Sequence, residues 1–204
     1  MKVLKPKKQG NLDGACGFYS VANAVDLLTE IDPDVTFRCL IESMLQDKDP
    51  MCFIDGMERG TLKDIISRTF KKLNSDELEL VDEDTGESYV PSLKCNIPYW
   101  QTEPSNRDDF VSLMTEVDMN KTGAVAIIGY DYRPDENGAE YSHWTVVKKV
   151  TEKNLITFDS GDERKLIPWD KVRVSSRSDD KKYNTKRPYF IFPKDVFLIT
   201  NQSG

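Results

Sequence analysis

Cysteine and histidine are the residue types in this sequence that together can carry out nucleophilic catalysis. A cysteine attacks as its thiolate, and a neighbouring imidazole is the usual means of forming that thiolate. His143 is the only histidine of the chain, so any such pair must use it. Asp159 follows His143 by 16 residues (159 − 143) and is of the type that holds an imidazole in one orientation. Cys16, His143 and Asp159 are therefore the candidate catalytic residues.

Cys16 lies at the end of a glycine-punctuated stretch that begins at Gln9, and an amphipathic pattern starts directly after it. This arrangement places a thiol at the N-terminus of a helix, where the helix dipole and the free backbone N–H groups favour a thiolate. Gln9 lies upstream in the same stretch and is a candidate donor for an oxyanion hole. The sequence thus indicates a cysteine-nucleophile enzyme.

The apolar pattern predicts helices in the first half of the chain and strands in the second. Apolar residues recur at helical spacing over 17–30, 36–46, 61–73 and 105–118. Short apolar runs predict strands over 124–130, 142–147, 154–159, 189–192 and 196–200. Antiparallel pairing of 142–147 with 154–159 would bring His143 beside Asp159 at one end of the sheet. Helices that lead and strands that follow predict an α+β fold.

Prolines and polar residues predict where some of these elements end. Asp32-Pro33 is expected to end the first helix, because the residue before a proline is pushed out of the α region. Thr61 and Asp64 resemble a capping box at the start of the third helix. Residues 91–104 include several prolines and are expected to be irregular. No repeat or convincing linker divides the chain, so a single domain over 1–204 is expected.

The composition describes a globular protein with a well-solvated surface and argues against some functions. Hydrophobic residues make up 38% of the chain and charged residues 31%, and the formal net charge is -7. This negative balance argues against a nucleic-acid groove, since phosphate binding needs a basic face. No apolar run approaches the roughly 18 residues of a membrane helix, and the lysine-rich residues 1–10 lack a signal core. A cytoplasmic protein is expected, with export that uses no cleaved signal left open.

The four cysteines, at 16, 39, 52 and 95, do not form a metal-binding or disulfide pattern. They include no C-x-x-C pair, and a zinc cluster would want cysteine and histidine grouped at short spacings. A cytoplasmic protein would keep the thiols reduced. Cys39 and Cys52 are expected to be buried structural residues. The acidic turn 82–86 lacks the ligand spacing of a calcium loop, and no cofactor or metal is expected.

Three short motifs together resemble the papain-like cysteine peptidase superfamily. They are Asp13-Gly14-Ala15-Cys16-Gly17-Phe18-Tyr19-Ser20, then Ser142-His143-Trp144-Thr145-Val146-Val147, then Phe158-Asp159-Ser160-Gly161. Within that superfamily the chain is most similar to the bacterial peptidases that cleave double-glycine leader peptides, and to their soluble relatives. The order Gln, Cys, His, Asp matches the family, as does a helix that opens on the cysteine. The resemblance implies a papain-like fold and spans the chain from Gln9 to at least Asp159.

The resemblance also implies a role for each motif residue. Cys16 would be the nucleophile, His143 the general base and then acid, and Asp159 the orienting group. Gln9 and the backbone N–H of Cys16 would form the oxyanion hole. The interval from Gln9 to Cys16 is one residue longer than is common in the family, so Asn11 is the alternative donor. Trp144 is expected to be core or a wall of the cleft.

The activity expected is hydrolysis of an amide or isopeptide bond in a protein or peptide substrate, through a thioester acyl-enzyme. Leader peptidases of this family are often fused to a transporter, and leader processing is not expected of this chain. Two alternatives remain open at the level of sequence. The same triad serves glutamine deamidases and transglutaminase-like enzymes, including bacterial effectors. A papain-like fold can also persist as a binding module with a dormant site. The sequence does not predict the oligomeric state.

Overall fold

A computed structural model describes the fold over most of the chain. The described residues are 15–29, 31–46, 49–75, 80–81, 86, 88–99, 104, 106–114, 117–133, 141–159, 166–174 and 186–202. Helices come first: α1 (Cys16–Thr29), α2 (Pro33–Met44), α3 (Cys52–Asp55) and α4 (Arg59–Leu73). Strands dominate the remainder, interrupted by α5 (Arg107–Leu113) and α6 (Met119–Thr122). The predicted α+β class, with N-terminal helices and a C-terminal antiparallel sheet, is confirmed.

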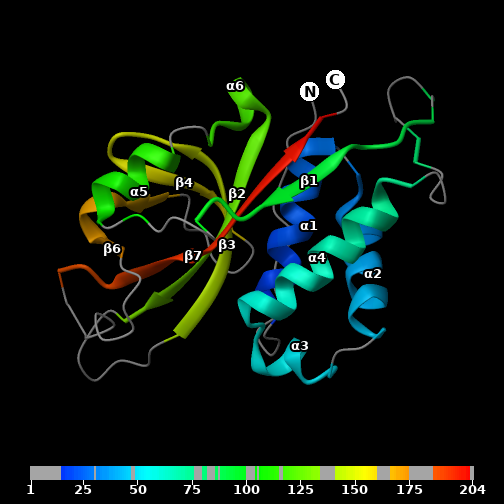
Figure 1. The fold of residues 1–204 in the computed structure, drawn as a ribbon, viewed down its shortest axis with the longest axis horizontal. Helices are drawn as coiled ribbons and strands as arrows, with labels where there is room; N and C mark the ends of the chain where they lie inside the picture. Colours follow the sequence, from blue (N-terminus) through cyan, green and yellow to red (C-terminus); the bar gives the residue numbers. More distant parts are fainter. Residues whose placement is uncertain are drawn as a thin grey trace.

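The strands form one sheet in the order β1-β7-β2-β3-β4-β5. Every neighbouring pair in this order is antiparallel, and β6 pairs parallel with β7 off the main path. The strands are β1 (Leu93–Asn96), β2 (Ala124–Tyr132), β3 (Tyr141–Val150), β4 (Asn154–Phe158), β5 (Leu166–Pro168), β6 (Val172–Val174) and β7 (Tyr189–Asn201). A 3-10 turn, η2 (Trp169–Lys171), joins β5 to β6. Figure 1 shows α1, α2 and α4 together on one side of the sheet.

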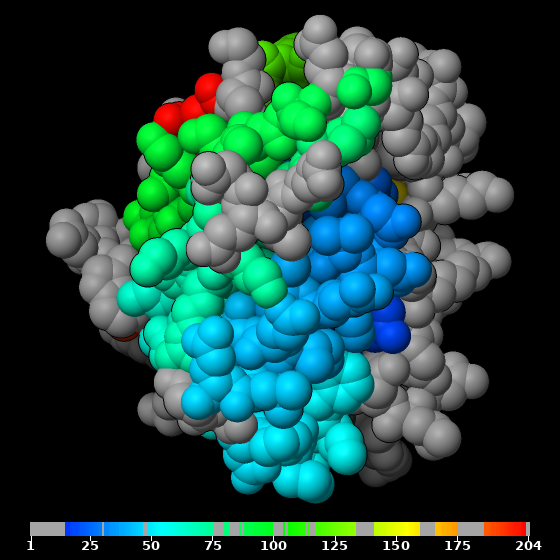
Figure 2. Space-filling model, turned by 90° about the vertical axis from the view of Figure 1, so that its right-hand side faces the viewer, coloured from blue at the N-terminus to red at the C-terminus, as the bar shows by residue number. Residues whose placement is uncertain are grey.

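The central strand β2 is apolar from Ala124 to Tyr130 because both faces of this part are covered. Val125 and Ile127 join the helix-side core, which also contains the buried faces of α1, α2 and α4. Ala126 and Ile128 join a second core on the other face, with residues of α5 and η2. This two-sided burial explains the continuous apolar run, since alternate residues of a strand point to opposite faces. The helix-side face of the molecule is the one seen in Figure 2, where α2 and α4 form much of the surface.

Two helices begin earlier than predicted. The first helix, α1, ends at Thr29, before Asp32-Pro33. Pro33 is itself the first residue of α2, where a proline loses no hydrogen bond. Asp32 caps this helix, because its side chain accepts the N–H of Asp34 at 2.8 Å. The helix α4 begins at Arg59 after Glu58, so Thr61 lies inside it. The predicted Thr61–Asp64 capping box is therefore wrong.

The predicted helix over 105–118 is also wrong in length. Asn106 caps α5 by accepting the N–H of Asp109, and the helix ends at Leu113. Asp118 then caps the separate short helix α6, with its side chain accepting the N–H of Asn120 at 3.1 Å. A cap residue takes an extended backbone conformation, and Asp118 does so here. The local preference of Asp118 for a cap thus outweighs the helical spacing of the apolar residues.

The edge and bulge of the sheet also depart from the sequence prediction. Residues 93–96, expected to be irregular, form β1 on the edge of β7. Asn74 holds this strand at its first residue, by donating to the Leu93 carbonyl and accepting the Leu93 N–H, each at 2.8 Å. The two strands predicted over 189–192 and 196–200 are one strand, β7, with an irregularity. Ile128 pairs with Val196 whereas Tyr130 pairs with Ile191, so Phe192–Asp195 bulge out opposite a single residue of β2.

Among the described residues, no helix has the length and hydrophobicity needed to cross a membrane.

Candidate active site

Cys16 is the first residue of α1 and is buried, with 7% of its surface exposed. The N–H of Tyr19 reaches back to the Ala15 carbonyl at 3.1 Å, so the helix is established from its first turn. The backbone N–H groups ahead of that bond have no partner within the helix and concentrate positive charge at its N-terminus. The first turn of α1, which is described in full, carries no acidic residue. Cys16 thus occupies the position predicted from the sequence.

His143 and Asp159 come together through the pairing of β3 with β4. These strands are antiparallel, as predicted, with Val146 opposite Phe158, and Asp159 directly follows β4. The Nε2 atom of His143 lies 3.1 Å from Oδ1 and 3.2 Å from Oδ2 of Asp159. Asp159 is buried, and a buried carboxylate needs a hydrogen-bond partner of this kind. The carboxylate therefore orients the imidazole ring.

Cys16 completes a chain of three side chains by a hydrogen bond with His143. Burial lowers the pKa of His143, but the hydrogen bonds with Asp159 and Cys16 and the charges of both partners raise it to about 9. Since Nε2 faces Asp159, the Nδ1 atom is left for the hydrogen bond with Cys16. An imidazole between a thiol and a carboxylate can carry the proton that the thiol gives up.

Two aromatic residues lie beside His143: Tyr130 packs on its ring, and Trp144 follows it in β3. Tyr130 lies opposite His143 in the β2–β3 register, and the two rings meet edge to face with centroids 5.6 Å apart. Trp144 lies in the core, with 7% of its surface exposed. This is one of the two places expected for it from the sequence. Its indole N–H donates to the Met57 carbonyl at 3.0 Å. The packing of Tyr130 against His143 was not predictable from sequence, because it depends on the register in which β2 pairs with β3.

Gly129 makes room for the Trp144 indole. A Cβ atom added to Gly129 would lie 3.1 Å from two ring carbons of Trp144 and 3.1 Å from the Cβ of Asp195. Gly129→Ala is therefore expected to destabilise the protein by about 1–3 kcal/mol, as overpacking of a core does. Urea unfolding measures this directly. Gly60→Ala is the matched control, because Gly60 lies in α4 and a Cβ there would have no atom within 4 Å. A loss of stability as large in Gly60→Ala as in Gly129→Ala would contradict the packing argument.

The remaining predicted site residues lie outside the described residues. These are Gln9 and Asn11, the two candidate donors of the oxyanion hole, and Ser160 and Gly161 of the last motif. The acidic turn that was weighed for calcium, residues 82–85, lies outside them as well. The side-chain donor of the oxyanion hole stays a prediction, whereas the backbone of Cys16 is described at the start of α1.

The other three cysteines contrast with Cys16. All four cysteines are described, and none forms a disulfide bond. Burial raises the pKa of the Cys39 thiol, and burial raises the pKa of Cys95 to about 12. Cys39 is buried in α2, as predicted, while Cys52 is half-buried rather than buried. Within the described part of the chain, no three Cys, His, Asp or Glu side chains are grouped so that they could hold a metal ion.

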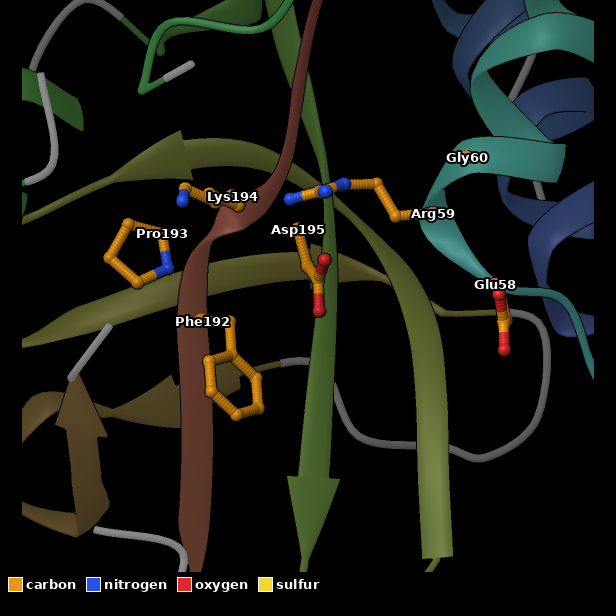
Figure 3. A pocket seen from close by; sticks show the side chains of 7 residues that line it. All are labelled: Glu58, Arg59, Gly60, Phe192, Pro193, Lys194 and Asp195. Atoms are coloured by element: carbon orange, nitrogen blue, oxygen red, sulfur yellow. The ribbon is translucent and has the colours of Figure 1, made fainter. Parts of the chain in front are cut away.

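Two surface pockets are found in the described part of the chain. The first, of about 290 Å³, lies between the start of α4 and the β7 bulge, where Arg59 extends toward Lys194 and Asp195 (Figure 3). The second, of about 630 Å³, is lined by α5, β5 and η2. Neither is lined by Cys16, His143 or Asp159. The chemistry of the triad, rather than pocket size, therefore defines the candidate site.

The chain was compared with protein-family models and with curated proteins, and neither comparison gave a match. The candidate site therefore rests on its own geometry.

Proposed function

We propose that this protein is a cysteine-dependent hydrolase that cleaves an amide or isopeptide bond, in a domain of papain-like fold. The observation that supports this proposal best is the hydrogen-bonded series Cys16–His143–Asp159 at the N-terminus of α1. Three residue types of complementary chemistry, drawn from a helix, a strand and a strand end, meet in one buried place. Packing alone does not call for a thiol, an imidazole and a carboxylate in series, and buried polar groups are costly unless they are paired.

The proposed reaction proceeds in two stages. The thiolate of Cys16 attacks the substrate carbonyl, and the C–S bond forms as the carbonyl π electrons move to oxygen. Backbone N–H groups at the start of α1, with Gln9 or Asn11, would stabilise this oxyanion. His143 then gives its proton to the leaving amine, and a thioester remains on Cys16. Water, deprotonated by His143, attacks the thioester, which releases the carboxylic acid and returns the proton to the site.

Thiol reactivity tests the site without knowledge of the substrate. Iodoacetamide is expected to label Cys16 faster than Cys39, Cys52 or Cys95 at about pH 6, where an ordinary thiol is protonated. Mass mapping of the alkylated peptides over time gives the four rates separately. Cys95 serves as the internal control, because its raised pKa, about 12, keeps it unreactive. Labelling of Cys16 no faster than that of the other three cysteines would reject the proposal and favour a dormant binding module.

The reaction type is tested by mass analysis of a mixed peptide library after incubation with the protein. Hydrolysis of the main chain gives pairs of new fragments. Deamidation replaces an amide by an acid without breaking the chain, and acyl transfer joins two library members. Cys16→Ala should abolish all products, because no other group of the site can form the thioester. Products that persist in Cys16→Ala would exclude Cys16 as the nucleophile.

A further inference from the structure

Ser20 connects the helix that carries Cys16 to the strand that carries His143. Its hydroxyl donates to the backbone carbonyl of Trp144 at 2.8 Å, and the bond is buried. Ser20 is 1% exposed. It lies one helical turn after Cys16, on the same face of α1, because residues four apart on a helix are neighbours. Trp144 directly follows His143 in β3. The bond therefore joins α1 to β3 at one helical turn from Cys16 and one residue from His143.

Within the sheet this end of β3 is held by β2, where Gly129 pairs with Trp144 and Tyr130 with His143. The ladder between β3 and β4 begins only at Val146 and Phe158, and neither ladder fixes this end of β3 against α1. The indole of Trp144 packs close to α1, since a Cβ on Gly17 would lie 3.6 Å from it. Apolar contacts favour burial without a fixed direction, whereas a hydrogen bond fixes both distance and angle. The indole itself is anchored at Met57.

We propose that Ser20 is a positioning residue that sets the separation of Cys16 and His143 through its hydrogen bond to the Trp144 carbonyl. This inference rests on the proposed function and deepens it. The hydrogen bond of the Ser20 hydroxyl goes to the backbone of Trp144 rather than to a reacting side chain. It acts by fixing α1 against β3, and catalytic geometry is sensitive to displacements of about 1 Å.

The test is the replacement Ser20→Ala, with the pKa of His143 as the readout. Because His143 is the only histidine, its ring carbon and nitrogen signals in NMR need no assignment. The variant should lower the measured pKa of His143 by about one unit, toward the value in Cys16→Ala, because the hydrogen bond with Cys16 is weakened. Alkylation of Cys16 at about pH 6 should slow by about tenfold or more.

Ser43→Ala is the matched control for a buried hydroxyl that joins two elements away from the site. Thr69 of α4 donates to the Ser43 hydroxyl of α2 at 3.1 Å, and this bond is also buried. Loss of this bond should lower stability to a similar degree and leave the pKa of His143 unchanged. If Ser20→Ala also leaves that pKa and the alkylation rate unchanged, Ser20 only packs and the inference is wrong.

Two further outcomes are distinguishable. If Ser20→Ala does not fold, Ser20→Cys answers the same question by NMR, since a thiol fills the space but donates only weakly; it should lower the pKa of His143, and an unchanged pKa overturns the inference. If His143 in the unaltered protein titrates at its ordinary value and Cys16 is no more reactive than the other cysteines, the proposed function itself fails. Failure confined to the Ser20 variants leaves the proposed function standing.

Discussion

Replacement of His143 by glutamine is expected to slow alkylation of Cys16 at about pH 6 by about 100-fold, and hydrolysis of any substrate by about 1000-fold. The imidazole is the group beside Cys16 that can hold the proton of the thiol, and glutamine cannot take that proton. Glutamine does keep an N–H donor near the position of Nε2, which lies 3.1 Å from Asp159. The buried carboxylate therefore stays paired, and the variant removes the acid–base function more than the packing.

The contrast among the four cysteines makes this experiment specific. In His143→Gln, the alkylation rates of Cys39, Cys52 and Cys95 should not change, since the causes that raise the pKa of Cys39 and Cys95 do not include His143. Urea unfolding of the unaltered protein and of the variant at about pH 10, where His143 of the unaltered protein is neutral, gives the difference in stability that comes from packing. Rapid labelling of Cys16 that survives the loss of His143 would mean that the helix terminus alone activates the thiol.

The His143–Asp159 contact was predictable from sequence because it is local in the sheet. Two apolar runs separated by a short polar segment pair as antiparallel strands, and the register then places residues near the two far ends side by side. Cys16 was different. It lies more than a hundred residues before His143, and the packing of α1 against β3 has no local signal. That part of the site was predicted from the resemblance and the residue types, not from the elements.

The features that sequence reasoning missed share one cause, which is their dependence on distant partners. β1 forms only because β7 offers an edge about a hundred residues later, and four residues carry too little pattern to reveal it. The bond from Ser20 to the Trp144 carbonyl has no sequence signal either, since a serine in a helix usually faces solvent or its own backbone. Local rules placed the caps wrongly at α4 and correctly identified the helix at Cys16.

The stability of the protein relative to His143→Gln is expected to depend on pH between about 6.5 and 9. The pKa of His143 rises from its ordinary value of 6.5 in the unfolded chain to about 9 in the fold, as Asp159 and Cys16 outweigh burial. The folded state therefore binds the proton more tightly. Its extra stability is complete below about pH 6.5 and is lost as the pH rises through about 9. By linkage, the difference amounts to about 3 kcal/mol at most.

Urea unfolding of both proteins under reducing conditions, at about pH 6 and at about pH 10, measures this difference. Titrations common to both proteins cancel when the two free energies of unfolding are subtracted, so the remainder belongs to His143 and the groups that face it. Cys16→Ala separates the partners, because it keeps the carboxylate of Asp159 and removes the thiol; the loss of stability should then be smaller and should be complete at a lower pH. A difference between the unaltered protein and His143→Gln that is constant across this range would mean that His143 keeps an ordinary pKa. The thiol, the imidazole and the carboxylate would then be neighbours that do not share a proton.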